Sequence, residues 1–552
     1  MKHIRTMSFL LAFLLLFALF SACSNNRTEP TATPPATSNE VKTPDGNDND
    51  GDTLSYPLPG EKTTFEVWTI GFNSANKYGY TSLNDYPAYA ELEKRTNVHI
   101  EWMLPADTGD AMASFSLVIA SEDYPDSFQT NIGYYSGGFD SYIENEIIID
   151  IKDLVEQYCP DYYRYYNSDE EFRKGFVTDS GYMPGFFAIM KEKEGSWIGP
   201  VIRADMYDKF GLPDPVTLED LHDYLMLMKE QYNLTKGPLL FNQQGLQQFI
   251  LAAWNIEPKF YVVDNTVKYG IVQPEFKEYV TLMRQWYSEG LIDRDFISKN
   301  TMWYHSDYVT SVTSDDYVYF DAFYGAFEGL YASAENPNYK LRPVNVPVLT
   351  EGQQRLVRDH SAHDVSKIRN SVGTITVDCE QPDILARWYN YMYTDEGFLL
   401  ANYGTEENHY IDENGKPQYN MDLITNVPEG FTAMDAVNQI RLPVSVVQIY
   451  DWSHQILPIL KPEAAEANKT WDANYTEQRT MPSMVSLTAE ESSAYSAIAT
   501  DIDTFVAENV VKFITGQKSM DEYDAFIEQL CTMDLEEMIA YQQAALDRYN
   551  ER

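Results

Sequence analysis

Two kinds of hydrophobic pattern alternate along the first part of the chain. Residues 63–72, TTFEVWTIGF, alternate apolar and polar positions among β-forming residues, which predicts a strand. The later AYAELEKRTNVHIEWML predicts a helix that carries Leu92 and ends near Asn97, followed by a strand at Val98–Leu104. DAMASFSLVIASEDYPDSFQT then predicts a helix, a turn and a further apolar element. This order of strands and helices predicts an α/β fold with a largely parallel sheet.

Two helices further along have a clear apolar face and a clear end. In GLPDPVTLEDLHDYLMLMKEQY, Pro215 forms the entry turn and Thr217 is the N-cap, with Asp220 three residues later. EFKEYVTLMRQWYSEGLID repeats the pattern and ends at Gly290. The predicted buried faces are Leu221, Tyr224, Leu225 and Met228 in the first helix, and Tyr279, Leu282, Met283 and Trp286 in the second.

The apolar run at the start of the chain is too short to span a membrane. It covers twelve residues, Phe9 to Phe20, whereas a spanning helix needs about 20. A charged start and a small-residue end are typical of a secretory signal, here residues 1–22. The alternative is a buried or interfacial N-terminal helix. Ser21-Ala22-Cys23 resembles the lipobox of bacterial lipoproteins, which implies lipidation at Cys23, although Phe20 departs from the usual leucine-like residue.

Residues 23–56 predict a disordered tether, because they contain almost no large apolar side chains. Within it, DGNDNDGD is not a calcium loop, since alignment on Gly51 puts Gly46 at the first acidic position and Pro57 at the last. We therefore predict no metal site and no cofactor.

Catalytic and disulfide signals are also missing from the sequence. Cys159, Cys379 and Cys531 are far apart and lie in no metal-binding spacing, so we interpret them as core thiols. The sequence contains no H-E-x-x-H, no G-x-S-x-G and no glycine-rich phosphate loop. These observations predict a protein that is not an enzyme.

Size and charge narrow the function further. Of 552 residues, about 500 follow the tether, enough for two lobes. The net charge of −44 argues against nucleic acid, and it disfavours an anionic ligand unless a basic pocket lies locally. The 41 Tyr and 9 Trp favour a ligand with apolar faces and many hydroxyls, sugars above all.

Four segments in order carry a specific resemblance. They are VIRADMYDKFGLPDPVTLEDLHDYLMLMKE, LMRQWYSEGLIDRDFI, ILARWYNYMYTDEGFLLANYGTEENHYIDENGKPQYN and FITGQKSMDEYDAFIEQL. The chain from Thr63 onward resembles the family 1 extracellular solute-binding proteins, in particular the large lipoprotein subgroup of Gram-positive bacteria. These are receptors of ABC importers, mostly for oligosaccharides.

The resemblance implies a type II periplasmic-binding-protein-like fold, with two α/β lobes joined by a hinge of several crossing strands and the ligand between them. One lobe would hold residues 57–199 and 316–373, the other 200–315 and 374–552. The crossings would fall near SWIGPVIR, DDYVYFDAFYGAF and SVGTITVDC.

The implied function is a lipid-anchored receptor on the outer face of the cytoplasmic membrane. It would act as a monomer, bind a small-molecule ligand such as an oligosaccharide, and deliver it to membrane permease subunits. The lipid anchor would be its only contact with the membrane. Two alternatives remain open: a receptor of the same fold for a peptide or for sensing without transport, and a secreted glycoside hydrolase, which would need two carboxylates roughly 5–9 Å apart.

Ligand-facing residues are expected in loops after strands and at the crossings. The candidates are Trp68, Phe72, Tyr134, Tyr135, Trp197, Arg203, Gln247, Trp254, Trp303, Asp321, Tyr324, Tyr403 and Glu406. For Trp68 and Trp254 the alternative is packing in the core, and for Arg203 it is a structural ion pair with Asp205 or Asp208. Trp286 and Trp388 lie on apolar helix faces and are expected in the core.

Overall fold

The computed structural model describes residues 54–70, 75–105, 111–192, 195–302, 305–357, 366–443, 446–451, 459–473, 475–476 and 479–552. The predicted signal peptide, Cys23 and the tether up to residue 53 lie outside this range. Tyr56, which the sequence analysis placed in the tether, packs in the fold instead. Its hydroxyl donates to the carbonyl oxygen of Arg387 at 2.6 Å, and its ring meets Tyr391 edge-on at 4.9 Å. Tyr56 therefore belongs to the fold and not to the tether.

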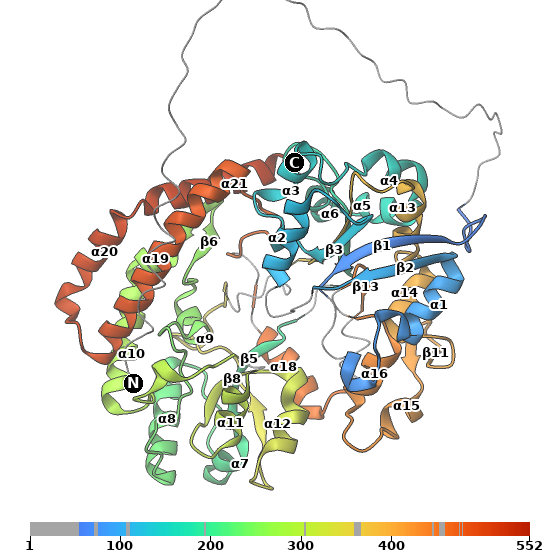
Figure 1. The fold of residues 1–552 in the computed structure, drawn as a ribbon. Helices are drawn as coiled ribbons and strands as arrows, with labels where there is room; N and C mark the ends of the chain where they lie inside the picture. The colour runs from blue at the N-terminus through green and yellow to red at the C-terminus, as the bar shows by residue number, and fades with distance from the viewer. Residues whose placement is uncertain are drawn as a thin grey trace, which may run out of the picture. The chain divides into compact units, whose positions relative to one another are not determined.

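Six strands form the main sheet in the order β13-β4-β10-β3-β1-β2. Their bounds are β1 (Thr63–Thr69), β2 (Val98–Met103), β3 (Ser127–Asn131), β4 (Phe186–Met190), β10 (Ile368–Ile375) and β13 (Ile449–Tyr450). β1 pairs in parallel with β2 and β3, and β13 pairs in parallel with β4. β10 is antiparallel to both β3 and β4. Figure 1 shows β1, β2 and β3 side by side, as the predicted α/β order requires.

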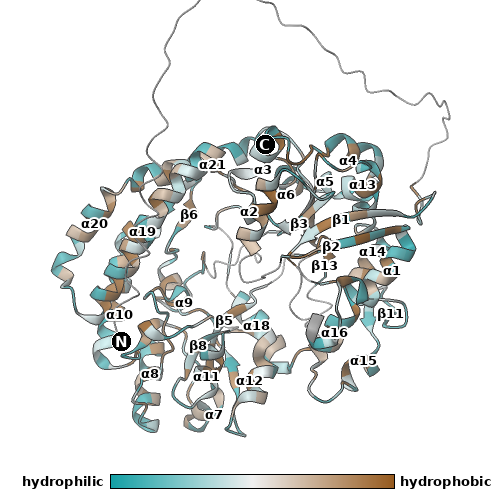
Figure 2. Ribbon diagram, viewed as in Figure 1, coloured by the Kyte–Doolittle hydropathy of each residue, from teal (hydrophilic) through white to brown (hydrophobic). Residues whose placement is uncertain are grey.

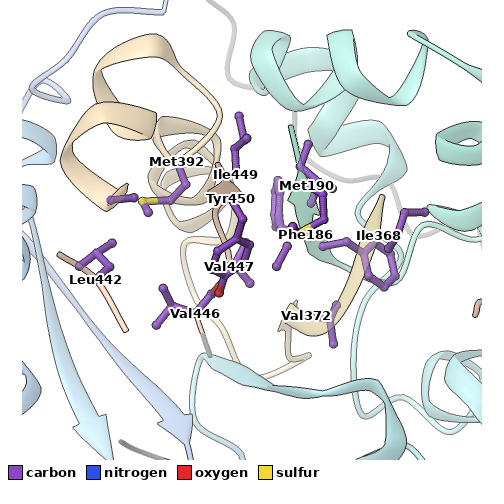
Figure 3. Packing of buried hydrophobic residues seen from close by; sticks show 14 of the residues in the cluster. Phe186, Met190, Ile368, Val372, Met392, Leu442, Val446, Val447, Ile449 and Tyr450 are labelled. Carbon is purple, nitrogen blue, oxygen red and sulfur yellow. The ribbon is translucent and has the colours of Figure 1, made fainter. Parts of the chain in front are cut away.

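Helices pack around this sheet and close the first large core. They are α1 (Pro87–Thr96), α2 (Ala111–Ser121), α3 (Gly138–Glu144), α4 (Lys152–Tyr158), α5 (Pro160–Tyr166), α6 (Glu170–Gly175), α13 (Pro382–Tyr391), α14 (Asp395–Tyr403), α15 (Met421–Thr425) and α16 (Ala433–Ile440). α1 ends where predicted, because Asn97 takes the left-handed conformation with φ 62°. Phe186, Val372 and Tyr450, from three neighbouring strands, meet in this core (Figure 3).

A smaller sheet lies between the first core and a second one. It contains β5 (Ile198–Arg203), β8 (Tyr319–Phe323) and β9 (Leu341–Pro343), antiparallel in the order β8-β5-β9. Side chains alternate along these strands. Val201 and Phe320 belong to the first core cluster, whereas Ile202 and Tyr319 belong to the second. The two cores are therefore joined through the two faces of one sheet.

The second core is mainly helical. It is built from α7 (Ala204–Tyr207), α8 (Leu218–Tyr232), α9 (Gln248–Leu251), α10 (Pro274–Glu289), α19 (Ala489–Thr515), α20 (Tyr523–Cys531), α21 (Leu535–Glu551) and the hairpin of β6 (Phe260–Val263) and β7 (Thr266–Tyr269). The predicted capping box of α8 is present, with Thr217 and Asp220 bonded reciprocally. Gly290 ends α10 with φ 71°, also as predicted. Figure 2 shows both hydrophilic and hydrophobic residues along α8, α19 and α20, as amphipathic helices require.

The remaining elements connect the two cores or lie at their margins. They are α11 (Ser306–Thr313), α12 (Phe327–Ser333), α18 (Pro462–Asp472), β11 (His409–Ile411), β12 (Pro417–Tyr419), η1 (Ala75–Tyr78), η2 (Leu83–Asp85), η4 (Ile132–Tyr134), η5 (Asp208–Phe210), η6 (Ala252–Trp254), η7 (Gly270–Val272), η8 (Phe296–Ser298), η9 (Tyr324–Ala326) and η11 (Met520–Glu522). Trp286 and Trp388 are buried in the cores, as predicted.

Three expectations need correction. Residues 374–450, assigned to the second lobe, pack with the first sheet: β13 pairs with β4, and α13 contacts β10. SVGTITVDC, expected to be a crossing, begins within β10, whose residues from Ser371 to Ile375 pair with β3 at the centre of that sheet. Cys531 is exposed, whereas Cys159 and Cys379 are buried free thiols.

Candidate functional site

The parallel strands of the main sheet all end at one edge. Since β10 is antiparallel to both β3 and β4, these two strands are parallel to each other. β1, β2 and β13 run in the same direction as β3 and β4. The edge therefore carries Thr69, Met103, Asn131, Met190, Tyr450 and the first residue of β10, Ile368. In open α/β sheets, ligands bind in the crevice outside these carboxyl ends.

Trp197 links this edge to the smaller sheet. It lies in the connection between β4 and β5, and its carbonyl oxygen accepts a hydrogen bond from the amide of Tyr324 at 3.1 Å. Its half-buried ring lies 6.5 Å from the ring of Phe323. The Trp197 ring also contacts Arg369, whose guanidinium carbon lies 4.7 Å from the centre of the indole. The edge of one sheet and the end of the other therefore meet around one indole, which we name the Trp197 junction (Trp197, Phe323, Arg369 and Tyr450).

Arg369 is the second residue of β10 and contacts two aromatic rings of the junction. Besides Trp197, the ring of Tyr450 lies 5.1 Å from its guanidinium carbon. Arg369 is only 8% exposed. A cation against aromatic faces is attracted by the ring quadrupoles, and more strongly where water is excluded.

Gln247 and Asp321 form a polar pair beside the smaller sheet. The Gln247 side-chain amide donates to the Asp321 carboxylate, and its carbonyl oxygen accepts from the amide of Asn242 at 3.0 Å. The backbone amide of Gln247 donates to the hydroxyl of Tyr279 at 2.8 Å. Because Gln247 is 4% exposed and bonded on both sides, its position is fixed by the fold. The structure thus brings two predicted site residues together.

Two pockets lie beside predicted site residues, and the larger of the two borders elements of both cores. The larger has a volume of about 870 Å³ and is lined by residues around η4 and α3 on one side and around the start of α19 on the other, with Tyr135 among them. The smaller, about 320 Å³, is lined by Lys77, Tyr324, Asp435 and residues of α12 and α18. Tyr135 and Tyr324 are therefore the predicted residues that line these pockets.

Comparison with known proteins identifies the architecture. No model of a known protein family matches the chain. The chain is 22% identical over 526 residues to the fructooligosaccharide ABC transporter substrate-binding protein FusA of Streptococcus pneumoniae serotype 4, a match that covers 90% of this chain and 92% of FusA. An HMO-binding, ABC-transporter-associated solute-binding protein from Bifidobacterium longum infantis has a TM-score of 0.69 at 16% identity, with 88% of this chain and 99% of that one covered. The alginate-binding protein AlgQ2 has a TM-score of 0.66 at 20% identity, with 89% and 99% covered.

The chain has the fold of an extracellular solute-binding protein. This confirms the predicted resemblance and the two-lobe α/β class, because the match extends over nearly the whole of each partner.

At the ends of β1 and β3 of this solute-binding fold, the aromatic candidates pack mainly on one another. Trp68 is 2% exposed, and its ring lies 5.2 Å from Phe115 and 6.3 Å from Tyr134. Tyr135 is also buried, and its hydroxyl lies 3.1 Å from that of Thr374. Tyr134 is half-buried, and desolvation raises the pKa of its hydroxyl. Trp68 is thus a core residue, and Tyr134 is the one of these three with a partly open side chain.

Arg203 and Trp254 have structural partners. The guanidinium of Arg203 is fully buried and bonds to Asp205 at 2.9 Å and to Asp315 at 2.6 Å. Burial lowers the pKa of Arg203, but the two carboxylates more than offset this and raise it overall. The Trp254 indole donates to Glu278 at 2.8 Å. Arg203 therefore forms the structural ion pair with Asp205 that was given as the alternative to ligand binding.

Tyr403 and Glu406 contact residues outside the Trp197 junction. Tyr403 is fully buried, with its ring 5.0 Å from that of Tyr419. Glu406 is exposed and pairs with Arg95 at 2.6 Å. Phe72 and Trp303 lie outside the described residues.

Sequence reasoning missed Phe323, Arg369 and Tyr450. One signal was present: Arg369 lies next to the β-forming run SVGTITV, and charged residues are seldom buried unless paired. Phe323 and Tyr450 gave no such signal, because aromatic residues are common in strands.

The described part of the chain has neither a cluster of metal-binding side chains nor a membrane-spanning helix. There, no group of three or more His, Cys, Asp or Glu residues is arranged to hold a metal ion. Among the same residues, no helix combines the length and the apolar character that a membrane span needs.

Proposed function

We propose that this protein is the lipid-anchored, extracellular receptor of an ABC importer and that it captures an oligosaccharide for delivery to a membrane permease. The observation that carries the proposal is the end-to-end relationship with FusA, the substrate-binding protein of a fructooligosaccharide ABC transporter, together with the shared fold. The Trp197 junction supports it, because aromatic faces next to hydrogen-bonding groups suit sugar rings and their hydroxyls.

In this proposal the two lobes close on the ligand. Binding shifts the population toward the closed form only as far as the ligand prefers the closed lobes to the open ones. The half-buried rings of Trp197 and Tyr134 would cover sugar faces, and the closed pair of lobes would be recognised by the permease. The receptor acts as a monomer and releases its ligand unchanged, so it has no catalytic step.

The anchor is the second part of the proposal. Cleavage before Cys23 and lipidation of its thiol would hold the protein at the outer face of the cytoplasmic membrane. Stable anchoring requires more than one acyl chain, since each buried CH₂ contributes about 0.8 kcal/mol.

A thermal-melt panel tests the binding role. A soluble form beginning at Leu54 is melted with neutral oligosaccharides, acidic oligosaccharides and short peptides, and each ligand is recovered afterwards and analysed. A ligand at about 100 times its Kd stabilises the fold by roughly 2.7 kcal/mol. The proposal expects stabilisation by one class of saccharide, recovered intact. Stabilisation by peptides alone would contradict the saccharide assignment, and recovery of cleaved sugar would indicate a hydrolase.

Measurement of saccharide uptake by cells distinguishes a transport receptor from a receptor that only senses its ligand. Deletion of the gene is expected to abolish import of the stabilising saccharide, and the full chain should restore it. A Cys23→Ala chain should restore it poorly, because the receptor would then be lost from the cell surface. Unchanged uptake after deletion would contradict the importer role.

A further inference from the structure

Among the residues that the structure describes, Arg369 is a buried cation without an anionic partner. Within the described residues, four arginines are buried: Arg203, Arg355, Arg369 and Arg441. The first bonds to carboxylates, the second to the carbonyl oxygen of Val346 and the last to the side-chain oxygen of Asn438. Arg369 has no oxygen acceptor in this part of the chain. Its one hydrogen-bond partner is the sulfur of Met190 at 3.7 Å, a weak acceptor.

A buried guanidinium without acceptors for its N–H groups destabilises the fold unless water or a ligand accepts these hydrogen bonds. Leaving a buried charge uncompensated is strongly destabilising, and an unsatisfied buried polar group in a native protein needs an explanation. None of the Arg369 nitrogens is among the fully enclosed polar atoms that lack a partner in the described residues. Its unused N–H groups therefore remain within reach of water or of a small ligand.

The surroundings of Arg369 favour a planar anion. The rings of Trp197 and Tyr450 lie against the guanidinium, 4.7 and 5.1 Å from its carbon. In the described residues the guanidinium donates one hydrogen bond, from Nη1 to Met190, and the N–H groups of a guanidinium form a fork that matches a carboxylate with two parallel hydrogen bonds. A sugar ring that carries a carboxylate could place its apolar face on an aromatic ring and its charge on this fork.

One further ion pair lies at the same edge of the main sheet. Lys191 directly follows β4, and its ammonium lies 3.8 Å from the carboxylate of the buried Asp451. A net charge of −44 repels anions at long range, so an acidic ligand requires a cation such as Arg369 at the contact itself.

We propose that Arg369 binds the carboxylate of an acidic sugar residue, so that the ligand of this receptor is a uronate-containing oligosaccharide. This inference rests on the proposed function and adds the substrate class to it. The position fits, because Arg369 lies at the carboxyl edge of the main sheet, where it meets the smaller sheet through Trp197.

The test compares each uronate oligosaccharide with its carboxyl-reduced counterpart, which keeps the linkages and loses the charge. Affinities are measured by calorimetry at low salt for several uronic acids. The wild-type protein is expected to bind one acidic member at least about tenfold more tightly than its reduced form. Arg369→Gln should weaken the acidic ligand by roughly 30-fold or more and should change the reduced one by less than about threefold.

Two further variants complete the design. Arg369→Lys keeps the charge but loses the fork, so its affinity for the acidic ligand should lie between those of the wild type and Arg369→Gln. Arg294→Gln is the matched control, because Arg294 is exposed and lies against Tyr287 at 4.2 Å in the helical second core region. It should leave both affinities unchanged.

The outcomes separate the two proposals. Equal affinity for acidic and reduced sugars, a preference for a sulfated sugar, or binding of neutral oligosaccharides alone contradicts the role of Arg369 and leaves the receptor function standing. An Arg369→Gln protein that keeps the acidic preference also contradicts it. Failure to bind any saccharide overturns the proposed function and this inference together.

Discussion

The indole of Trp471 lies directly on Gly199. A Cβ atom at residue 199 would stand 2.5 Å from the Cδ2 and Cε2 atoms of the indole, and the indole nitrogen donates to the carbonyl oxygen of Pro200 at 3.1 Å. Helix α18 is thereby fastened to β5, the central strand of the sheet that joins the two cores. Only a residue without a side chain allows this approach.

Replacement of Gly199 by Ala should destabilise the protein. The added methyl group meets ring atoms that are fully packed, and overpacking of this kind costs about 1–3 kcal/mol. Urea unfolding should show a lower midpoint with an unchanged slope. Gly329→Ala is the control, since no atom lies within 4 Å of its Cβ position in helix α12 and alanine should stabilise the helix by about 0.4–1 kcal/mol. Equal midpoints for Gly199→Ala and the wild type would contradict the packing.

Substitution by methionine should destabilise the protein much more at Arg203 than at Arg369. Arg203→Met leaves Asp205, whose side chain is 6% exposed, without its cation and should cost about 3–5 kcal/mol of unfolding free energy. Arg369→Met removes a cation that has no carboxylate partner in the described residues, while the thioether still packs on the aromatic rings. It should cost less than about 1.5 kcal/mol.

Denaturant unfolding of both variants checks this difference. A loss for Arg369→Met as large as that for Arg203→Met would assign Arg369 a structural role in place of ligand binding.

The carboxylate of Asp435 should make stability depend on pH. Burial raises the pKa of Asp435, but hydrogen bonds from Lys77 and Thr432 outweigh it, and the pKa is lowered overall. A lowered pKa in the folded state adds stability above the unfolded value of about 3.9, and this is lost as pH falls through the folded pKa. Asp435→Asn should therefore be less stable than the wild type near pH 7, and the difference should shrink below about pH 4.

Unfolding curves between pH 3 and 7 measure this difference directly. In a Lys77→Met background the pKa of Asp435 should rise, so the acid loss should begin at higher pH. A difference between wild type and Asp435→Asn that stays constant across the range would show that charge at residue 435 does not contribute.

Local signals predicted much of the fold. The helix end at Asn97, the capping box of Thr217 and the C-cap at Gly290 all depend on residues within one turn of each other, and the structure has each of them. The place of β10 between β3 and β4 could not be predicted in this way. It depends on pairing between residues such as Ser371 and Asn131, which are far apart along the chain, and no local pattern specifies that partner.

The site was harder to predict for the same reason. The contacts of Arg369 come from Trp197, Tyr450 and Met190, three separate segments, and each looks ordinary in its own surroundings. Residue type and a position near a strand end or a crossing marked Trp68 and Arg203 as ligand contacts, although the first is buried in a core and the second pairs with the buried carboxylate of Asp205. A charge next to a β-forming run is the stronger signal, because its burial requires a partner from elsewhere in the fold.

The most direct test of the receptor function is a calorimetric titration of the soluble chain with the saccharide that raises its melting temperature, followed by chromatography of the recovered sugar. We expect one ligand bound per chain, saturation at micromolar concentration or below, and sugar returned with its length unchanged. Heat that continues at constant rate with shortened products, or no saturable binding to any saccharide of the panel, would contradict the account.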